Sequence, residues 1–403
     1  MNYLFTLGRT IPLCLAELEA LLKFNEITYK IILQIENHVI VDITREVDTE
    51  QLLKQSGGMV KISSLRGTIA STPPHDWDLL ASFVHYNSNF KNFGVSLVGF
   101  QENIVRICEE MKKDLKMHYI LPKDGNELSS AQILNKNILE LVIVKIGDEY
   151  QVFQTLSVQD INYWTRKDTG RPFVDDKLGM LPLKVARMMI NLGRGSREAE
   201  KEAKNTLMDP FCGMGSILVE AIDLGFIDVI GGDIQEDVLQ KCRANIEWFK
   251  KEFKYLNANT EFFLSDATKI SEKLHRKIDL IVTEPFMGDA KIIQNLKTRL
   301  AAKWVKNQSL SPSAIGDDSL KLKNIVKGLS KMYLGCLKNW RIILNSNSVV
   351  VIIVPEITVE NRLFTLPFVE ICAKTGYNIL AQYEYSREKA IVKRKIFLLK
   401  IIK

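Results

Sequence analysis

The sequence has few residues that could cross-link the fold through disulfide bonds or bind a metal ion. Its six cysteines lie far apart, with no C-x-x-C pair, and its five histidines are scattered without ligand spacing. This excludes a disulfide framework and a zinc site, and it is typical of proteins kept in a reducing compartment. We therefore expect a cytoplasmic protein that needs no metal.

The chain also lacks long hydrophobic runs. Its longest apolar stretches, such as residues 349–354, are far too short to span a bilayer. Its first residues lack the basic region and the long apolar core of a signal peptide, and no internal repeat or low-complexity segment is evident. We expect no membrane partner.

What the chain does have is room for two or three domains, since it is 403 residues long. Hydrophobic residues make up 46% and charged residues 25%, which is typical of a globular protein. The net charge of +6 suits a polyanionic partner, although many basic proteins bind no nucleic acid.

The most informative stretch is Asp-Pro-Phe-Cys-Gly-Met-Gly-Ser at residues 209–216. A short apolar run precedes it and a segment of helical composition follows it. The sequence thus predicts a strand, a glycine-bearing turn and a helix, the arrangement that holds nucleotide-like cofactors. Gly213 and Gly215 let the backbone approach a ligand, and the first turn of the helix offers free N–H groups. Asp209 either caps this loop or contacts the cofactor, and Cys212 is expected to pack within the turn.

Three further strand-like segments follow, and each ends in an acid. Residues 229–233 end at Asp233, whose carboxylate can accept hydrogen bonds from both ribose hydroxyls of a cofactor. Residues 262–267 contain Asp266, which could bind an adenine amino group. Residues 278–288 end in Glu-Pro-Phe-Met-Gly, at the sheet edge where open α/β sheets carry out their chemistry.

The run Asp-Pro-Phe-Cys-Gly-Met-Gly-Ser-Ile resembles the S-adenosylmethionine-binding motif of class I methyltransferases. Within that class the sequence is similar to the RNA guanine-N2 methyltransferases that carry a THUMP domain, best known from the enzymes that modify guanine 10 of tRNA. The similarity is close across roughly residues 166–400, including residues 171–186 and 385–396, and loose before that. It implies S-adenosylmethionine as cofactor, tRNA as partner and an α/β fold with a seven-stranded, Rossmann-like mixed sheet.

On this basis we assign the cofactor to the first three strand ends and the chemistry to the fourth. The cofactor-binding residues are Asp209, Phe211, Gly213, Gly215, Asp233, Ile234, Asp266 and Ala267, and the catalytic residues are Glu284, Pro285 and Phe286. Glu284 and the carbonyl of Pro285 would accept the N–H bonds of the exocyclic guanine amine and orient its delocalised lone pair. Phe286 would stack on a base turned into the pocket. Proximity to the activated methyl group would carry much of the rate.

The fourth motif departs from the family pattern, which is usually Asp-Pro-Pro-Tyr followed by Gly. Aligned without gaps, Glu284 takes the place of the Asp, whereas a shift of one residue puts Thr283 there and Phe286 at the aromatic place. The sequence leaves both alignments open, so the departure bears on catalytic efficiency more than on cofactor binding.

The chain before this region predicts two smaller α/β modules. Residues 1–70 have the order β-α-β-β-α-β, which suggests a ferredoxin-like module that packs or contacts RNA. Residues 71–165 are similar to the THUMP pattern, which would imply binding to the acceptor end of tRNA. We place the methyltransferase domain at residues 172–403.

Three segments have two interpretations each. Residues 162–173 are basic and aromatic, so they either stack a base and hold a phosphate or form a linker with Trp164 buried. The lysines of residues 112–116 either contact phosphates or form a solvated helix face. Residues 291–324 are either a substrate-facing insertion or plain helices and a loop. Residues 193–205 are expected to form a surface loop.

Three functions compete at this point. The first is an S-adenosylmethionine-dependent tRNA guanine-N2 methyltransferase, and the second is an adenine-N6 methyltransferase of DNA or RNA. The third is an RNA-binding protein with an impaired catalytic turn. Eukaryotic members of the family use a small activating subunit and archaeal members do not, so the resemblance leaves this partner open.

Overall fold

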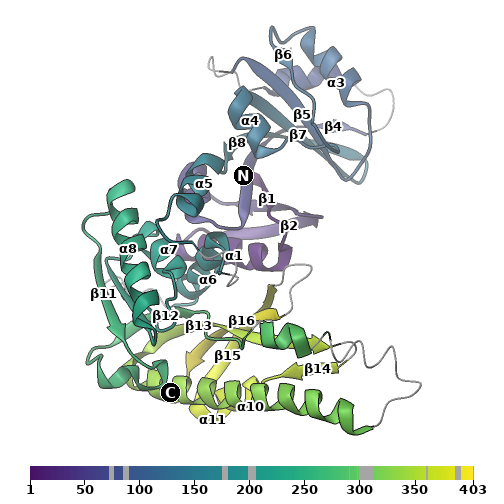
Figure 1. The fold of residues 1–403 in the computed structure, drawn as a ribbon. Coiled ribbons are helices and arrows are strands. Elements are labelled where there is room, and N and C mark those ends of the chain that lie inside the picture. Colours follow the sequence, from purple (N-terminus) through teal and green to yellow (C-terminus); the bar gives the residue numbers. More distant parts are fainter. Residues whose placement is uncertain are drawn as a thin grey trace. The chain divides into compact units, whose positions relative to one another are not determined.

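The computed structural model describes residues 1–71, 77–84, 90–174, 180–197, 206–289, 291–296, 298, 312–359, 362–385 and 392–402. It divides the chain into two compact units, Met1–Gly170 and Arg171–Lys403 (Figure 1). The predicted surface loop at 193–205 and the family-like stretches 171–186 and 385–396 lie partly outside the described residues, as does much of 291–324.

The first half of the N-terminal unit has the predicted β-α-β-β-α-β order. Its elements are β1 (Asn2–Leu7), α1 (Ile11–Phe24), β2 (Tyr29–Ile35), β3 (His38–Ile43), α2 (Thr49–Gln55) and β4 (Met59–Ala70). The four strands lie in the order β2-β3-β1-β4, and all of their pairs are antiparallel. This is the ferredoxin-like arrangement expected from the order of elements.

The second half of this unit extends the same sheet. Its elements are η1 (Trp77–Phe83), β5 (Asn92–Val98), α3 (Ile104–Lys112), β6 (His118–Tyr119), α4 (Ser130–Lys136), β7 (Ile138–Ile146), β8 (Glu149–Val158) and α5 (Ile161–Thr169). Because β8 pairs with β4, the sheet runs continuously as β2-β3-β1-β4-β8-β7-β5-β6. The continuous sheet shows no break between the two predicted modules, and their boundary at residue 70 stays a prediction. Helix α4 was not expected, although its capping box of Ser129 and Gln132 is a sequence signal for a helix start.

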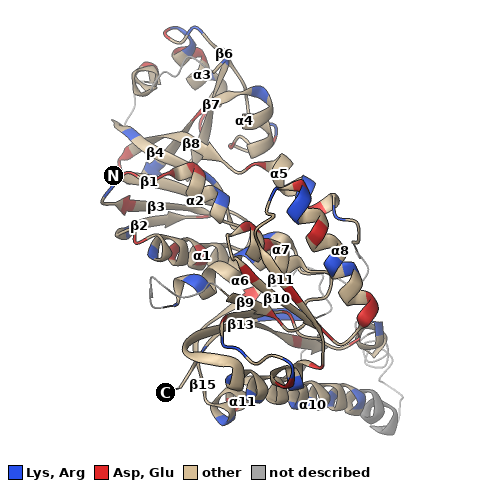
Figure 2. Cartoon of the chain, turned by 90° about the vertical axis from the view of Figure 1, so that its left-hand side faces the viewer, with Lys and Arg blue, Asp and Glu red and all other residues tan. Residues whose placement is uncertain are grey.

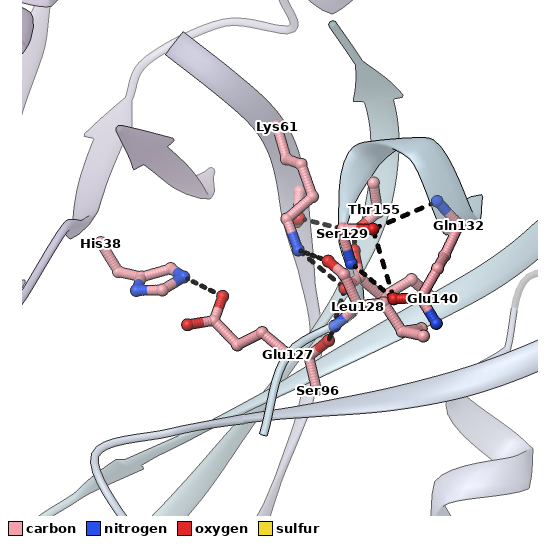
Figure 3. A network of polar contacts seen from close by, with 10 residues as sticks. His38, Lys61, Ser96, Glu127, Leu128, Ser129, Gln132, Glu140 and Thr155 are labelled. Atoms are coloured by element: carbon pink, nitrogen blue, oxygen red, sulfur yellow. Dashed lines mark hydrogen bonds and ion pairs between the residues drawn. The ribbon is translucent and has the colours of Figure 1, made fainter. Parts of the chain in front are cut away.

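A buried polar network crosses this sheet (Figure 3). Lys61 of β4 donates to Glu140 of β7 at 2.8 Å, and the two side chains are 2% and 0% exposed. The hydroxyls of Ser96 on β5 and Thr155 on β8 each donate to the same carboxylate at 2.5 Å. A buried carboxylate requires such partners, because desolvation penalises an unpaired charge heavily.

Helix α5 holds the basic, aromatic residues before the boundary of the units. Trp164 is 8% exposed, and the Nζ of Lys167 lies 4.2 Å from the centroid of its ring. Trp164 is thus buried, as one of the two interpretations expected, but residues 161–169 form a helix and not a linker. The lysines Lys112, Lys113 and Lys116 are exposed.

The C-terminal unit is built on a second twisted sheet with strand order β11-β10-β9-β12-β13-β16-β15. Its elements are α6 (Leu183–Gly195), β9 (Thr206–Asp209), α7 (Ser216–Asp223), β10 (Asp228–Asp233), α8 (Glu236–Glu252), β11 (Asn259–Leu264), η2 (Ala267–Glu272), β12 (Ile278–Thr283), α10 (Pro312–Ile343), β13 (Leu344–Val359), β14 (Arg362–Thr365), α11 (Phe368–Thr375), β15 (Tyr377–Tyr385) and β16 (Lys393–Ile401). The first five strands of that order pair in parallel, and β16 and β15 complete the sheet antiparallel. The predicted seven-stranded mixed sheet is confirmed.

Alternate residues of the central strands point to opposite faces of this sheet. Met208 and Ile281 belong to a core with Tyr333 and Trp340 of α10. On the other face, α6 approaches so closely that a Cβ at Gly193 would lie 2.5 Å from Leu280. Strand β14, which pairs with the end of β13, was not expected, because an element of four residues carries little periodic signal.

Candidate active site

The glycine loop lies between β9 and α7, as the sequence predicted. Gly213 has φ +49° and Gly215 has φ +87°, in the left-handed region that favours glycine. A Cβ at Gly215 would come within 2.9 Å of the Cys242 sulfur, whereas a Cβ at Gly213 would meet nothing within 4 Å. The loop is therefore packed on one side and open at Gly213.

Asp209 ends β9 and is 1% exposed. Its Oδ1 accepts hydrogen bonds from the backbone N–H of Phe211 at 3.1 Å and from the hydroxyl of Thr283 at 2.7 Å. Burial raises the pKa of its carboxyl to about 7, although these two hydrogen bonds act in the opposite direction. Asp209 thus connects the glycine loop to β12, and the rings of Phe211 and Trp340 form a T-shaped contact with a centroid distance of 6.5 Å.

Asp233 ends β10 and lies beside the same loop. Its Oδ2 accepts from the backbone N–H of Gly213 at 3.1 Å, and its Oδ1 accepts from that of Gln235 at 3.0 Å. A carboxylate has about four acceptor positions, so it keeps capacity for further donors. Ile234, directly after it, is 67% exposed, so its side chain is accessible to a ligand.

Asp266 and Ala267 follow β11, at the start of η2. The Oδ1 of Asp266 accepts from the backbone N–H and from the hydroxyl of Thr268, both at 2.8 Å. Asp266 is exposed, whereas Ala267 is buried and its carbonyl accepts from the indole N–H of Trp340 at 3.0 Å.

The turn after β12 carries the predicted catalytic residues. Thr283 is the last residue of the strand and is fully buried, and Glu284 is the first residue beyond it. The hydroxyl of Thr283 is bonded to Asp209, and the assignment of the acidic place to Glu284 stays a prediction. Pro285 is buried and Phe286 is 58% exposed.

Glu284 has a partner that the sequence analysis missed. The Nε of Arg394, on β16, donates to its Oε1 at 2.5 Å, and the two side chains are 11% and 16% exposed. Residues 392–396 were noted only as a family-like stretch. The sequence feature that could have indicated this contact is Arg394, a basic residue near the start of a strand.

A second missed group joins the start of this unit to the glycine loop. Asn245 of α8 is fully buried; its side chain accepts from the N–H of Phe173 at 2.9 Å and donates to the carbonyls of Phe173 and Met214 at 2.9 and 3.0 Å. The buried guanidinium of Arg171 donates to the hydroxyl of Ser216 at 3.2 Å. The sequence feature that could have revealed this group is Asn245, a polar residue on the apolar stripe of a helix.

Cys212 packs within the turn, as expected. It is 4% exposed, and a hydrogen bond with Cys242 and burial raise the pKa of its thiol well above the usual range. All six cysteines are free and buried. Over the described ranges, no group of three or more His, Cys, Asp or Glu side chains could hold a metal ion.

The described glycine loop, Asp233 and Glu284 all lie at the carboxyl edge of the parallel strands. Crystallised TrmN from Thermus thermophilus is similar over 100% of both chains, with a TM-score of 0.56 and 14% identity. The C-terminal unit has the Rossmann-like methyltransferase fold. Residues 201–332 also match the family described as "Methyltransferase domain".

Curated relatives are similar over part of the chain. The chain is 35% identical over 124 residues to the tRNA (guanine(10)-N2)-dimethyltransferase of Pyrococcus abyssi, covering 30% of this chain and 32% of that protein. It is 32% identical over 146 residues to the protein of the same name in Methanothermobacter thermautotrophicus, covering 36% and 38%. The matched segments thus span about a third of the length of these relatives, 32% and 38%. In the part of the chain that is described, no helix is long and apolar enough to cross a membrane.

Proposed function

We propose that this protein transfers a methyl group from S-adenosylmethionine to the exocyclic N2 of a guanosine in tRNA. The observation that carries the proposal is the alignment of Gly213, Asp233 and Glu284 along one edge of a methyltransferase sheet. The partial similarity to tRNA guanine-N2 dimethyltransferases supports the choice of substrate.

The residues at this edge fit the proposed cofactor. Open space over Gly213 admits a ligand close to the backbone, and the first turn of α7 presents unpaired N–H groups next to it. Asp233 offers acceptors for ribose hydroxyls, and the exposed Asp266 offers an acceptor for an amino group. When bound, S-adenosylmethionine supplies an activated methyl group. The chain's own residues hold both reactants.

The catalytic turn orients the nucleophile in this proposal. The carboxylate of Glu284 and the carbonyl of Pro285 accept the two N–H bonds of the guanine amine, which turns its nitrogen toward the methyl group. Arg394 holds the Glu284 carboxylate in one orientation. The exposed ring of Phe286 stacks on the base that is turned out of the RNA. Much of the rate comes from holding the two reactants in line.

The proposal extends to the N-terminal unit and the surroundings of the protein. We infer that this unit is a THUMP-like RNA-binding part, with exposed lysines on and after α3 suited to phosphate contacts. We place the enzyme in the cytoplasm, a reducing compartment that suits six free cysteines.

The test is methyl transfer from labelled S-adenosylmethionine to unmodified tRNA, followed by nucleoside analysis. We expect N2-methylguanosine from the wild type and its loss in Glu284→Ala, with cofactor affinity retained. N6-methyladenosine would instead identify an adenine methyltransferase. Cofactor binding without any methylated nucleoside would contradict autonomous activity, and a small activating subunit or an impaired catalytic turn would then be the next hypothesis.

A further inference from the structure

A small apolar cluster lies beside the catalytic turn, apart from the main core. We call it the outer cluster; its buried members are Ile293, Leu296, Leu322 and Ile357, and partly buried Ile325, Phe364 and Val392 pack against it. These residues come from the segment after the turn, the first half of α10, the β13–β14 arm and the residue before β16. The arm and the first half of α10 are side by side in Figure 1.

The outer cluster contacts the catalytic turn directly. Gly288 ends the Glu-Pro-Phe-Met-Gly turn with φ +93°, and a Cβ there would lie 2.9 Å from Ile293 and 3.5 Å from Ile325. A side chain at position 288 would therefore force the turn and the cluster apart. The outer cluster is therefore packed directly against the end of the catalytic turn.

A groove of about 520 Å³ opens on this cluster. Its lining consists of Ser319, Lys323, Val326, Leu363, Phe364 and Thr365. The volume is in the range of small-ligand sites, about 300–1,000 Å³. Leu363 is 57% exposed and Lys323 is exposed, so the groove combines an apolar and aromatic wall with a cation. Aromatic side chains next to basic ones are typical of sites that bind a nucleic-acid strand.

The described charges that border the groove favour a polyanion. On α10, Lys321, Lys323 and Lys327 lie within or next to the stretch that lines the groove, and from Ser319 to Ile343 the helix has no aspartate or glutamate; Asp317 and Asp318 directly precede that stretch in the sequence. Figure 2 shows basic positions along this helix. The acid of β13, Glu356, is paired with Lys395 at 2.5 Å.

We propose that this groove binds the RNA strand next to the target nucleotide, with Lys323 at a phosphate and Phe364 against a base. The inference rests on the proposed function, because it assumes that the substrate is an RNA. It assigns the groove-lining residues of α10, from 319 to 326, and those of β14, from 363 to 365, to substrate positioning. A neighbouring nucleotide held there fixes the register of the target base over Glu284.

The test compares Lys323→Gln with Lys338→Gln, a matched change of an exposed lysine on the same helix outside the groove. Binding of the full-length proteins to tRNA is measured over a salt series, and methyl transfer and S-adenosylmethionine affinity are measured beside it. Loss of one phosphate contact makes the plot of log affinity against log salt concentration less steep, by about 1 in the slope. We expect this decrease in Lys323→Gln alone, with cofactor affinity unchanged.

Phe364→Leu provides a second, independent measurement. Leucine keeps the apolar contact with the outer cluster but removes the ring, so we expect tRNA affinity to fall about fivefold or more without a change in salt slope. Normal slope and affinity in both variants would overturn the inference and point to a protein partner for the groove. A wild type that neither binds nor methylates tRNA would instead overturn the proposed function, and the inference with it.

Discussion

Arg394 and Glu284 form an ion pair of 2.5 Å between residues 110 positions apart in the chain. The pair exists because β16 runs antiparallel to β13, which returns the start of β16 to the carboxyl edge of β12 and β13. A planar guanidinium can fix the orientation of a carboxylate, which a more mobile ammonium group does less well.

Replacing Arg394 should therefore impair methyl transfer more than cofactor binding. We expect Arg394→Met to lower kcat by about 10- to 100-fold, since small misplacements of a catalytic group have effects of this size. Arg394→Lys should be intermediate because it keeps the charge. Steady-state kinetics with tRNA and calorimetry with S-adenosylmethionine measure both effects. An equal loss of cofactor affinity would argue that the pair only stabilises the fold.

Asp233→Ala should weaken cofactor binding. The carboxylate accepts from Gly213 N–H at 3.1 Å, and in our proposal it also accepts from ribose. Loss of hydrogen bonds to a charged group has a cost of about 1.5–3 kcal/mol, or roughly 10- to 150-fold in the dissociation constant. Asp237→Ala is the matched control, since that aspartate is 71% exposed on α8. Equal affinity in the two variants would contradict the assignment.

Asp209 should make stability depend on pH. Burial raises the pKa of its carboxyl from 3.8 to about 7, so the folded state holds a proton that the unfolded state has released. Its stabilising contribution is fully present below pH 3.8 and is lost as the pH rises through about 7. We expect Asp209→Asn to flatten the decrease in the free energy of unfolding between pH 5 and pH 8. Urea titrations at both pH values measure it, and an unchanged decrease would implicate other groups.

Asn245→Ala should weaken the attachment of the segment around Phe173, at the start of the C-terminal unit. It removes three hydrogen bonds and leaves the N–H and carbonyl of Phe173 and the carbonyl of Met214 without this partner. Each buried polar group left unpaired has a cost of about 1–3 kcal/mol. We expect lower stability in urea and weaker binding of S-adenosylmethionine, because Met214 belongs to the glycine loop. Full affinity in Asn245→Ala would show that the segment does not support the loop.

Lys61→Met should destabilise the N-terminal unit strongly. It leaves Glu140, which is 0% exposed, without its cation. Breaking a buried ion pair from one side has a cost of about 3–5 kcal/mol. The double variant Lys61→Met/Glu140→Gln removes both charges and should recover part of this loss. Urea unfolding of the single and double variants is the measurement, and additive losses would show that the two residues do not act as a pair.

Much of the methyltransferase unit could be predicted because its signals are local. The apolar runs before Asp209, Asp233 and Glu284 are short enough to indicate strands, and two glycines four and six residues after the first of these strands indicate a turn with positive φ. Strand β14 and helix α4 were missed because short elements carry few periodic residues.

The sequence by itself determined the order of strands and helices and the acids that follow the strands, since these depend on neighbouring residues. Only the tertiary structure decided which of those acids lie buried, which are paired and which remain exposed. Asp209 bonds to Thr283, Glu284 pairs with Arg394, and Asn245 holds Phe173, each across 70 or more positions. Such contacts arise from strand register and helix packing, and no local pattern of residues encodes them.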